Sequence, residues 1–385
     1  MSGVTLLLKN LTRNKLRTLL TVAAIALPML VFTVARSFVD VVDLVLRESD
    51  RNMRVAVHQK LTYTTYMPQR LRGEIESLAP PGAVTAICRT SWFGGHIENT
   101  QSTFPNMAVD RDTFPIVYSE FGLSPEAVER FRNERRGAVV GRPTADQMNW
   151  KIGDRVTLVG GLPPFLTLEF VIAGIIEKTN NPWLYFGLDY YNECYQQATG
   201  EAVGIHNFWL KCGSPSAREW ALSEIDKHFA NTDHETRTEM ESTFLAAFTR
   251  SGGDWVGLVW TVGRLIVLVA VSVAFNTLSM AFRERTRELA VLRALGFSAG
   301  KIVRMVLYEG FVLGLLAALI GVLPLYVLTR LVELQLPSIP FAVSISGTTL
   351  TVASTVAIAC GVLAAIVPAW RSSRLKVATA LRKVV

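Results

Sequence analysis

The sequence predicts an α-helical membrane protein with four transmembrane helices and one α+β extracytoplasmic domain between the first and the second helix. Of its 385 residues, 50% are hydrophobic and 18% are charged, which is more apolar than an ordinary soluble domain. Four apolar runs reach the length of roughly 18 to 20 residues that a spanning helix needs: residues 18–35, 265–282, 302–329 and 344–369. A long polar stretch separates the first two, so one large domain lies on one side of the membrane.

The first apolar run is expected to remain as a helix and not to be cleaved as a signal peptide. A long basic arm precedes it, Arg36 and a further apolar segment follow it, and the chain has no small-residue cleavage pattern there. Residues 1–44 are therefore assigned to a cytoplasmic arm, the first helix and a stalk. Residues 251–282 are assigned to a second stalk and the second helix.

The basic residues next to the spans predict the orientation of the chain. They gather in the arm before the first span (Lys9, Arg13, Lys15, Arg17), between the second and third spans (Arg283, Arg285, Arg287, Arg293, Lys301, Arg304) and in the tail (Arg371, Arg374, Lys376, Arg382, Lys383). The positive-inside rule then places both termini and the second connection in the cytoplasm. Acidic residues outnumber basic ones in residues 37–263, so the net charge of +7 comes from a basic cytoplasmic rim. That distribution indicates a membrane surface and not a nucleic acid partner.

The extracytoplasmic domain is expected at residues 45–250 and mixes strand and helix patterns. Alternating apolar residues predict strands at 53–60, 83–90, 155–160, 166–176 and 205–212, while helical spacing predicts helices at 68–79, 124–135 and 215–229. The turn-forming segment "GLPPF" divides the third and fourth of these strands. A strand-helix-strand part with a β-rich insertion at about residues 113–200 is the expected arrangement.

Several residues that invite a catalytic or metal-binding interpretation are better explained by structure. Asp154 in "KIGDRV" is expected to form a turn. The five histidines show no metal-ligand spacing, so we expect no metal site. Cys194 and Cys212 both lie in the outer domain, where a disulfide between them is one alternative and two free thiols the other. The aromatic residues Trp183, Tyr185, Phe186, Tyr190 and Tyr191 are expected inside the domain, and a lipid-facing surface is the alternative.

A short charged helix between two spans is the most informative segment. Leu289, Leu292 and Leu295 recur at three-residue spacing, and charged residues occupy the rest of the surface. Gly296 is expected to end this helix and Ser298 to cap the next one. The residues alone leave two alternatives open, a helix anchored in anionic headgroups and a helix that docks in a groove of a cytoplasmic protein.

Four segments together resemble MacB/FtsX-type (type VII) ABC transporter permeases. The segment "NTLSMAFRERTRELAVLRALGFSAGKIVRMVLYEG" is similar to their "ERTREIGxxRAxGAS" helix and its flanks, and "PAWRSSRLKVATALR" resembles their closing "PAxRAaRLxPxEALR". The opening "LKNLTRNKLRTLLTVAAIAL" is similar to the start of such permeases. "GAVVGRPTADQMNWKIGDRVTL" resembles a segment of their MacB-type periplasmic domain. These segments follow the order of the family along the whole chain.

The resemblance implies that residues 283–296, within a connection at 283–298, form a coupling helix seated in a cleft of an ATP-hydrolysing subunit. The implied contact residues are Glu284, Arg285, Thr286, Arg287, Glu288, Leu289, Leu292, Arg293, Leu295 and Gly296. The three leucines would supply the buried face, and the charged residues would set the register. The chain has no G-x-x-x-x-G-K-[ST] phosphate loop, so it is expected to be a non-catalytic subunit without a cofactor. ATP and Mg²⁺ would then be held by a pair of partner ATPase subunits, beside a second permease subunit that is either identical or different.

Among the polar residues inside the expected spans, Asn276 and Glu309 carry a functional expectation, because polar groups are costly there. Asn276 falls near the cytoplasmic end of the second span and Glu309 about two turns into the third, within residues 299–385, which hold the last two spans and the basic tail. Both stand where the resemblance expects an Asn and a Glu, and they would bond between helices and pass on movement of the coupling helix. Snorkelling of Glu309 to the interface and helix packing by Asn276 are the plainer alternatives.

The resemblance implies a permease subunit of an ABC transporter in the bacterial inner membrane. ATP hydrolysis in a separate subunit would drive export or extraction of a lipid, lipoprotein, peptide or amphiphilic drug by the periplasmic domain, with a periplasmic adaptor or lipoprotein and membrane lipids as further partners. The alternative is an FtsX-like subunit that activates an extracytoplasmic enzyme without transport. A large outer domain of MacB type favours the first.

Overall fold

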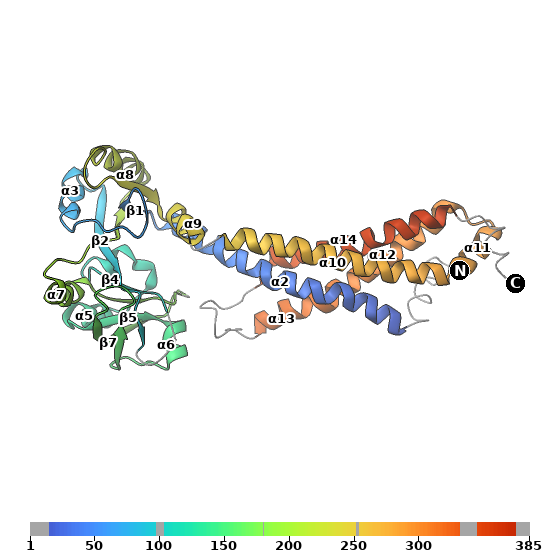
Figure 1. Ribbon diagram of the computed structural model, residues 1–385, viewed down its shortest axis with the longest axis horizontal. Helices are drawn as coiled ribbons and strands as arrows, with labels where there is room; N and C mark the ends of the chain where they lie inside the picture. The colour runs from blue at the N-terminus through green and yellow to red at the C-terminus, as the bar shows by residue number, and fades with distance from the viewer. Residues whose placement is uncertain (1–14, 98–103, 180, 252–253, 332–344, 375–385) are drawn as a thin grey trace. The chain divides into compact units, whose positions relative to one another are not determined.

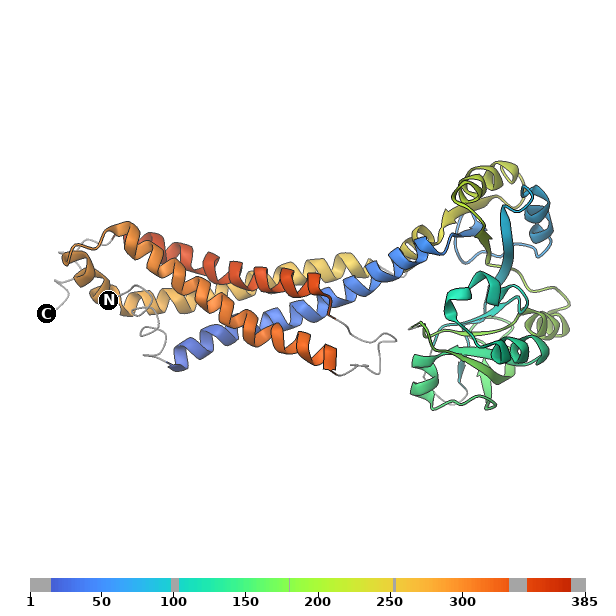
Figure 2. The same cartoon turned by 180° about the vertical axis from the view of Figure 1, so that it is seen from behind.

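The computed structural model describes residues 15–97, 104–179, 181–251, 254–331 and 345–374. It divides into two compact units (Figures 1 and 2). We call Met1–Val42, Asp254–Leu334 and Val343–Val385 the helical unit, and Asp43–Gly253 with Gln335–Ala342 the α/β unit. The predicted basic arm before residue 15, the short outer connection at 332–344 and the tail from residue 375 lie outside the described residues.

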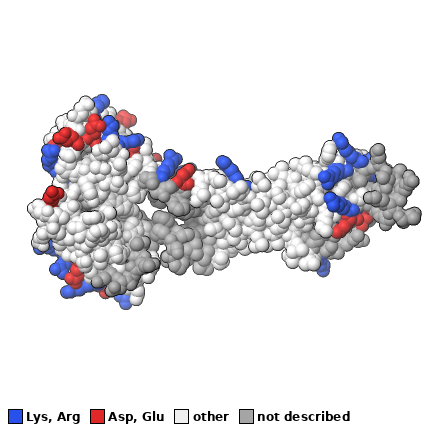
Figure 3. All heavy atoms as spheres, in the orientation of Figure 1, with Lys and Arg blue, Asp and Glu red and all other residues white. Residues whose placement is uncertain are grey.

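Six helices make up the described part of the helical unit. They are α2 (Lys15–Arg51, which continues into the α/β unit), α10 (Trp255–Glu284), α11 (Thr286–Ala294), α12 (Ala299–Gly321), α13 (Leu323–Leu331) and α14 (Gly347–Ser373). Four segments are long and apolar enough to cross a membrane, which confirms the predicted number: Thr18–Ser37, Val256–Glu284, Ala299–Leu331 and Gly347–Ser373. Figure 3 shows a long stretch of these spans with few charged side chains on the visible face.

Glycine residues allow the spans to pack closely. A Cβ atom added at Gly314 would lie 2.7 Å from the carbonyl oxygen of Ala357 on α14, and one at Gly321 would lie 2.6 Å from that of Ala26 on α2. Both distances are too short for any larger residue, so glycine allows α12 to approach its neighbours closely. The core around these contacts is rich in alanine, with Ala317 and Ala357 fully buried.

The α/β unit is built on one ten-stranded mixed sheet. Its strands are β1 (Arg54–Gln59), β2 (Val84–Trp92), β3 (His96–Ile97), β4 (Asn106–Val109), β5 (Gly137–Gly141), β6 (Arg155–Val159), β7 (Thr167–Ile176), β8 (Leu184–Gly187), β9 (Asn207–Cys212) and β10 (Thr236–Met240). Their order in the sheet is β10-β1-β9-β2-β4-β8-β5-β7-β6-β3. Strand β4 pairs with β8 and β5 with β7 in parallel, and the other pairs are antiparallel.

Helices cover this sheet on both faces, so strands such as β1, β5 and β8 are buried on both sides. The helices are α3 (Leu71–Leu78), α4 (Phe114–Val117), α5 (Pro125–Asn133), α6 (Arg142–Met148), α7 (Leu188–Thr199), α8 (Pro215–His228) and α9 (Glu241–Ser251). On β1, Val55 and Val57 belong to one core cluster and Ala56 between them to another. Alternate side chains of a strand point to opposite faces, which explains the division.

The structure confirms the predicted strands and helices of the domain. Residues 113–200, predicted as a β-rich insertion, contain β5 to β8 together with α4 to α7, and the same half of the sheet also takes in β3 and β4. The aromatic residues Tyr185, Phe186, Tyr190 and Tyr191 are buried in the core, as expected.

Candidate functional site

The amphipathic helix predicted at residues 283–296 is shorter in the structure. Helix α10 continues to Glu284, Arg285 lies in a turn, and α11 begins at Thr286. The hydroxyl of Thr286 donates to the carbonyl of Phe282 at 3.0 Å across the break. Glu284 therefore belongs to the end of the second span and not to the short helix.

The end of α11 agrees with the prediction. Gly296 has a φ of +93°, a conformation that side chains with a Cβ rarely adopt. Its N–H donates to the carbonyl of Arg293 and the N–H of Phe297 to that of Leu292, both at 3.1 Å, which is a Schellman motif. Ser298 then accepts a hydrogen bond from the N–H of Lys301 and caps α12. The turn between α11 and α12 is thereby fixed by the backbone.

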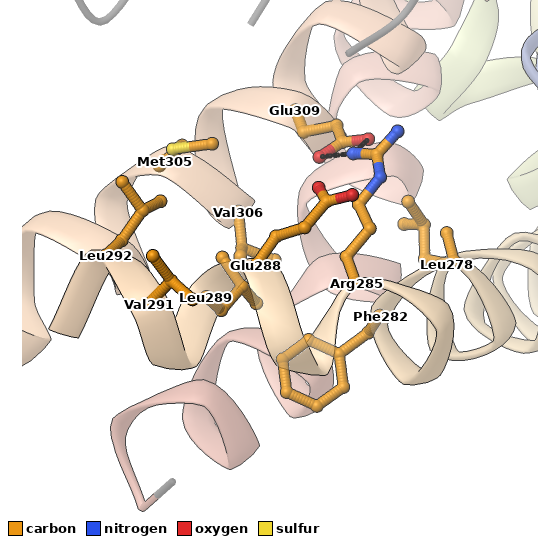
Figure 4. Close-up of a pocket in the computed structure, with 11 residues that line it drawn as sticks. Leu278, Phe282, Arg285, Glu288, Leu289, Val291, Leu292, Met305, Val306 and Glu309 are labelled. Atoms are coloured by element: carbon orange, nitrogen blue, oxygen red, sulfur yellow. Dashed lines mark hydrogen bonds and ion pairs between the residues drawn. The ribbon is translucent and has the colours of Figure 1, made fainter. Parts of the chain in front are cut away.

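An ion pair joins the α10–α11 break to the third span. Arg285 Nη1 lies 3.0 Å from Glu309 Oε1 and 3.3 Å from Oε2, and each side chain is 15% exposed (Figure 4). The sequence assigned these two residues separate roles, Arg285 in docking and Glu309 inside the membrane. The structure brings them together in one charged contact between the α10–α11 turn and α12.

The ion pair borders a cavity of about 320 Å³ between the end of α10, α11 and the start of α12. Its walls are mostly apolar and come from Leu278, Ala281, Phe282, Leu289, Val291, Leu292, Met305 and Val306, with Glu288 beside the ion pair (Figure 4). Leu278, Phe282, Met305 and Val306 were not among the site residues predicted from the sequence. Leu278 and Phe282 are one helical turn apart, and Phe282 lies one turn before Arg285. This spacing could have predicted that both residues lie on the same side of the helix as Arg285.

The three leucines of α11 do not share one environment. Leu289 is 6% exposed and packs inside its own chain, Leu292 is half-buried, and Leu295 is 72% exposed. The prediction that all three form an outward contact face is therefore wrong for Leu289, because the turn at Arg285 directs this residue into the cavity. The exposed apolar side chains here are Val291, Leu295 and Phe297.

The remaining predicted residues take several positions. Glu288 is exposed at the cavity, Arg293 is half-buried, and Arg287 lies within α11. Asn276 is exposed on α10, on the side away from the buried Ala274 and Leu278, and makes no hydrogen bond with Glu309 in the described part of the chain. Asn276 and Glu309 are thus not brought together.

A second charged cluster, which no sequence pattern predicted, lies where the chain enters and leaves the sheet of the α/β unit. Arg54 at the start of β1 bonds both oxygens of Glu241, which follows β10, at 2.8 and 2.7 Å, and it also contacts Glu120. The guanidinium lies 4.4 Å from the ring centre of Tyr118. Burial raises the pKa of Glu241, and the charge of Arg54 opposes that rise. The cluster connects the start of β1, which follows α2, to the start of α9, which follows β10.

Other candidate residues have structural roles. Asp154 accepts from the N–H of Lys151 at 2.7 Å and Gly153 has a φ of +97°, which confirms the predicted turn. All four cysteines are free, so Cys194 and Cys212 do not form a disulfide. Among the described residues there is no group of three or more His, Cys, Asp or Glu that could hold a metal ion.

The chain is similar to known permeases. Residues 260–377, which include the whole site around Arg285 and Glu309, match the family described as FtsX-like permease C-terminal. The chain is 26% identical over 237 residues to the ABC transporter permease YtrF of Bacillus subtilis, covering 56% of this chain and 53% of the relative. It is 30% identical over 140 residues to the lipoprotein-releasing system transmembrane protein LolC of Xylella fastidiosa, covering 31% and 34%. The chain thus spans about half or less of the length of these relatives.

Two solved structures resemble part of the chain. A domain of a permease protein from Porphyromonas gingivalis matches with 14% identity and a TM-score of 0.32, over 49% of this chain and 89% of that one. The extracellular domain of the noncanonic ABC-type transporter YknZ from Gram-positive bacteria matches with 10% identity and a TM-score of 0.33, over 48% and 99%. At these scores neither match establishes a shared fold.

Proposed function

We propose that this chain, which carries an FtsX-like permease domain homologous to ABC transporter permeases, is the membrane subunit of an ABC transporter whose ATPase is a separate protein. In this proposal the termini and α11 lie in the cytoplasm and the α/β unit lies outside, in a bacterial inner membrane. ATP and Mg²⁺ are held by a pair of ATPase subunits, and a second permease subunit completes the assembly.

The observation that carries the proposal is the exposed apolar surface at the end of α11, on a helix fixed at both of its ends. Val291, Leu295 and Phe297 are 45%, 72% and 41% exposed, next to the half-buried Leu292. Burial of apolar side chains of this size contributes roughly 1.5 to 3 kcal/mol each, which is enough for stable docking. We call these four residues the docking surface, and a groove on the ATPase is its proposed partner.

The contacts of the helical unit supply a route by which docking can act on the spans. Movement of α11 reaches α12 through Arg285 and Glu309, and α12 packs closely on α14 at Gly314. Helix α2 runs without a break from Lys15 to Arg51, three residues before β1. Arg54 is the first residue of β1 and Glu241 the first residue of α9. Their ion pair therefore joins the chain segment that follows α2 to the start of α9. Shifts of the spans would therefore reach the sheet at β1 and β10.

The proposed cargo is an amphiphile such as a lipid, lipoprotein, peptide or drug, which the α/β unit moves from the outer side of the membrane. Of the two relatives, LolC is described as part of a lipoprotein-releasing system. No residue of the described site selects one member of this class. A periplasmic adaptor or lipoprotein is the further partner that we propose for the α/β unit.

Co-purification from the native membrane tests the proposal. We expect the wild-type chain to retain an ATPase subunit in mild detergent and the Leu295→Asp variant to lose it, because a carboxylate cannot enter an apolar groove without cost. Leu61→Asp, which changes a leucine of similar exposure (82%) in the α/β unit, is the matched control and should retain the ATPase. Equal recovery with Leu295→Asp would contradict the docking surface. Recovery of a cell-wall hydrolase without any cargo would favour the alternative of a regulatory subunit without transport.

A further inference from the structure

Four exposed basic side chains lie at one end of the α12–α14 helix pair, and we call them the basic edge. They are Lys301 and Arg304 in the first two turns of α12, and Arg371 and Arg374 at the end of α14. Residues 310–329 and 347–370 contain no charged residue, so the basic edge lies at one boundary of the apolar part of both spans. Figure 3 shows Lys and Arg side chains gathered at this end of the helical unit.

The packing of the two helices places the members of the basic edge at matching levels. A Cβ atom added at Gly310 would lie 2.7 Å from the Cβ atom of Ala365, and one at Gly314 would meet the part of α14 that precedes Ala365, so the helices run antiparallel. Arg304 lies six residues before Gly310 and Arg371 six residues after Ala365. Each therefore stands roughly 9 Å along its helix from this contact. The other two members stand about one turn further out on each helix.

The positive charge of the basic edge is not balanced by nearby acids. Residues 299–308 and 365–374 contain no Asp or Glu, and within the described residues no member of the basic edge forms an ion pair with a carboxylate. Lys301 and Arg304 also stand at the N-terminal end of α12, where the helix dipole disfavours a cation and favours an anion. An anionic group at this level would offset both effects.

Two exposed aromatic residues accompany these cations. Tyr308 is 62% exposed and lies four residues after Arg304, on the same face of α12, and Trp370 is 53% exposed next to Arg371. The guanidinium of Arg374 lies 4.1 Å from the ring centre of Trp370. Exposed Trp and Tyr at the end of an apolar span are typical of the level of the lipid headgroups. Their apolar rings favour a lipid over an acidic protein as the partner, because they suit the boundary between headgroups and lipid tails.

We propose that the basic edge, with Tyr308 and Trp370, is a binding site for the phosphate headgroup of an anionic phospholipid in the cytoplasmic leaflet. The inference rests on the orientation of the chain in the proposed function, and it adds a lipid class and the residues that select it. The site also borders the docking surface, since Nζ of Lys301 lies 5.9 Å from the ring centre of Phe297. A bound lipid would thus hold the start of α12 next to the proposed ATPase contact.

Lipid binding to the purified full chain, without any ATPase, tests the site. Native mass spectrometry during titration with phosphatidylglycerol or phosphatidylcholine counts the bound lipids and gives their affinities. We expect the wild-type chain to bind phosphatidylglycerol more tightly than phosphatidylcholine. The double variant Arg304→Gln/Arg371→Gln should weaken phosphatidylglycerol binding roughly 30-fold, since each cation near an anionic headgroup accounts for a factor of about five. Its affinity for phosphatidylcholine should stay the same.

The matched control removes two exposed cations from the same ends of the other two spans. Lys15→Gln/Arg283→Gln changes the first residue of α2 and a residue in the last turn of α10, and it should bind phosphatidylglycerol as the wild type does. Equal losses in both double variants would show attraction to surface charge in general and would overturn the site. Equal affinity for the two lipids, or displacement of phosphatidylglycerol by inorganic phosphate at the same concentration, would overturn the lipid as its ligand. The assay contains neither ATPase nor cargo, so its outcome does not depend on whether the chain serves a transporter.

Discussion

The guanidinium of Arg285 and the carboxylate of Glu309 lie 3.0 Å apart and connect the break between α10 and α11 to the third span. Each side chain is only 15% exposed, and the apolar walls of the adjoining cavity surround the pair. In such surroundings, removal of one partner leaves a charge that is poorly solvated. The pair is therefore both a structural tie and a point at which force on α11 can reach α12.

Removal of one member of this pair should be more costly than removal of both. We expect Glu309→Ala to lower the free energy of unfolding by roughly 3 kcal/mol, because the partly buried Arg285 loses its counter-charge on α12. The double variant Arg285→Met/Glu309→Leu should recover most of that loss. Thermal unfolding in detergent over the complete double-mutant cycle measures the coupling. Additive effects of the two single changes would show that the pair does not act as a unit.

The turn after α11 should depend on glycine at a single position. Gly296→Ala should destabilise the helical unit by about 1 kcal/mol, because its φ of +93° is strained for any residue with a Cβ. Gly300→Ala is the matched control, since Gly300 lies in the first turn of α12 with open space around it, and it should be neutral or slightly stabilising. Chemical denaturation of the two variants compares them. Equal losses for both would contradict the Schellman motif as the reason for the glycine.

Glu241 should be essential to the α/β unit. It is 6% exposed and accepts hydrogen bonds from Nε and Nη2 of Arg54, so Glu241→Ala should cost roughly 3 to 5 kcal/mol by leaving the buried Arg54 with Glu120 as its remaining carboxylate partner. Glu235, whose ion pair with Lys60 lies at the surface, supplies the control. Glu235→Ala should leave the unfolding temperature nearly unchanged. A similar loss in both variants would contradict the special role of the Arg54–Glu241 pair.

His206 should make the α/β unit sensitive to acid. Burial lowers its pKa to about 4, and its Nδ1 accepts a hydrogen bond from the N–H of Trp92 at 3.1 Å, so the neutral ring is the native form. The unfolded chain takes up a proton near pH 6.5 and the folded chain only near pH 4. Stability is therefore fully present above pH 6.5 and falls between these values by about 3 kcal/mol. Tryptophan fluorescence against pH measures the loss, which should be smaller in His206→Gln; an unchanged slope would exclude His206 as its source.

The sequence was sufficient where one local pattern decides the structure. Apolar length predicted the four spans, alternation predicted the strands, and Gly296 and Ser298 marked the ends of α11 and α12 as the structure confirms. The sequence was insufficient where a contact depends on residues that are far apart along the chain. Arg54 and Glu241 are 187 positions apart, and nothing local indicates that they pair.

The site itself was predicted only in part. Residues 280–296 follow one helical period through Arg285, so the break that separates α10 from α11 was not visible in the pattern. Without that break, Leu289 and Leu295 are equivalent, whereas in the structure one faces the cavity and the other is exposed. The pairing of Arg285 with Glu309 depends on the same turn.

Photo-crosslinking from the end of α11 is the most direct test of the central claim that this surface docks on an ATPase. A photoreactive amino acid at position 295 is activated in the native membrane, and one at position 61 in the α/β unit serves as the control. We predict that an adduct with an ATPase subunit forms at position 295 and not at position 61. Adducts at position 295 with membrane lipids alone would contradict the claim and would assign α11 to the headgroup region.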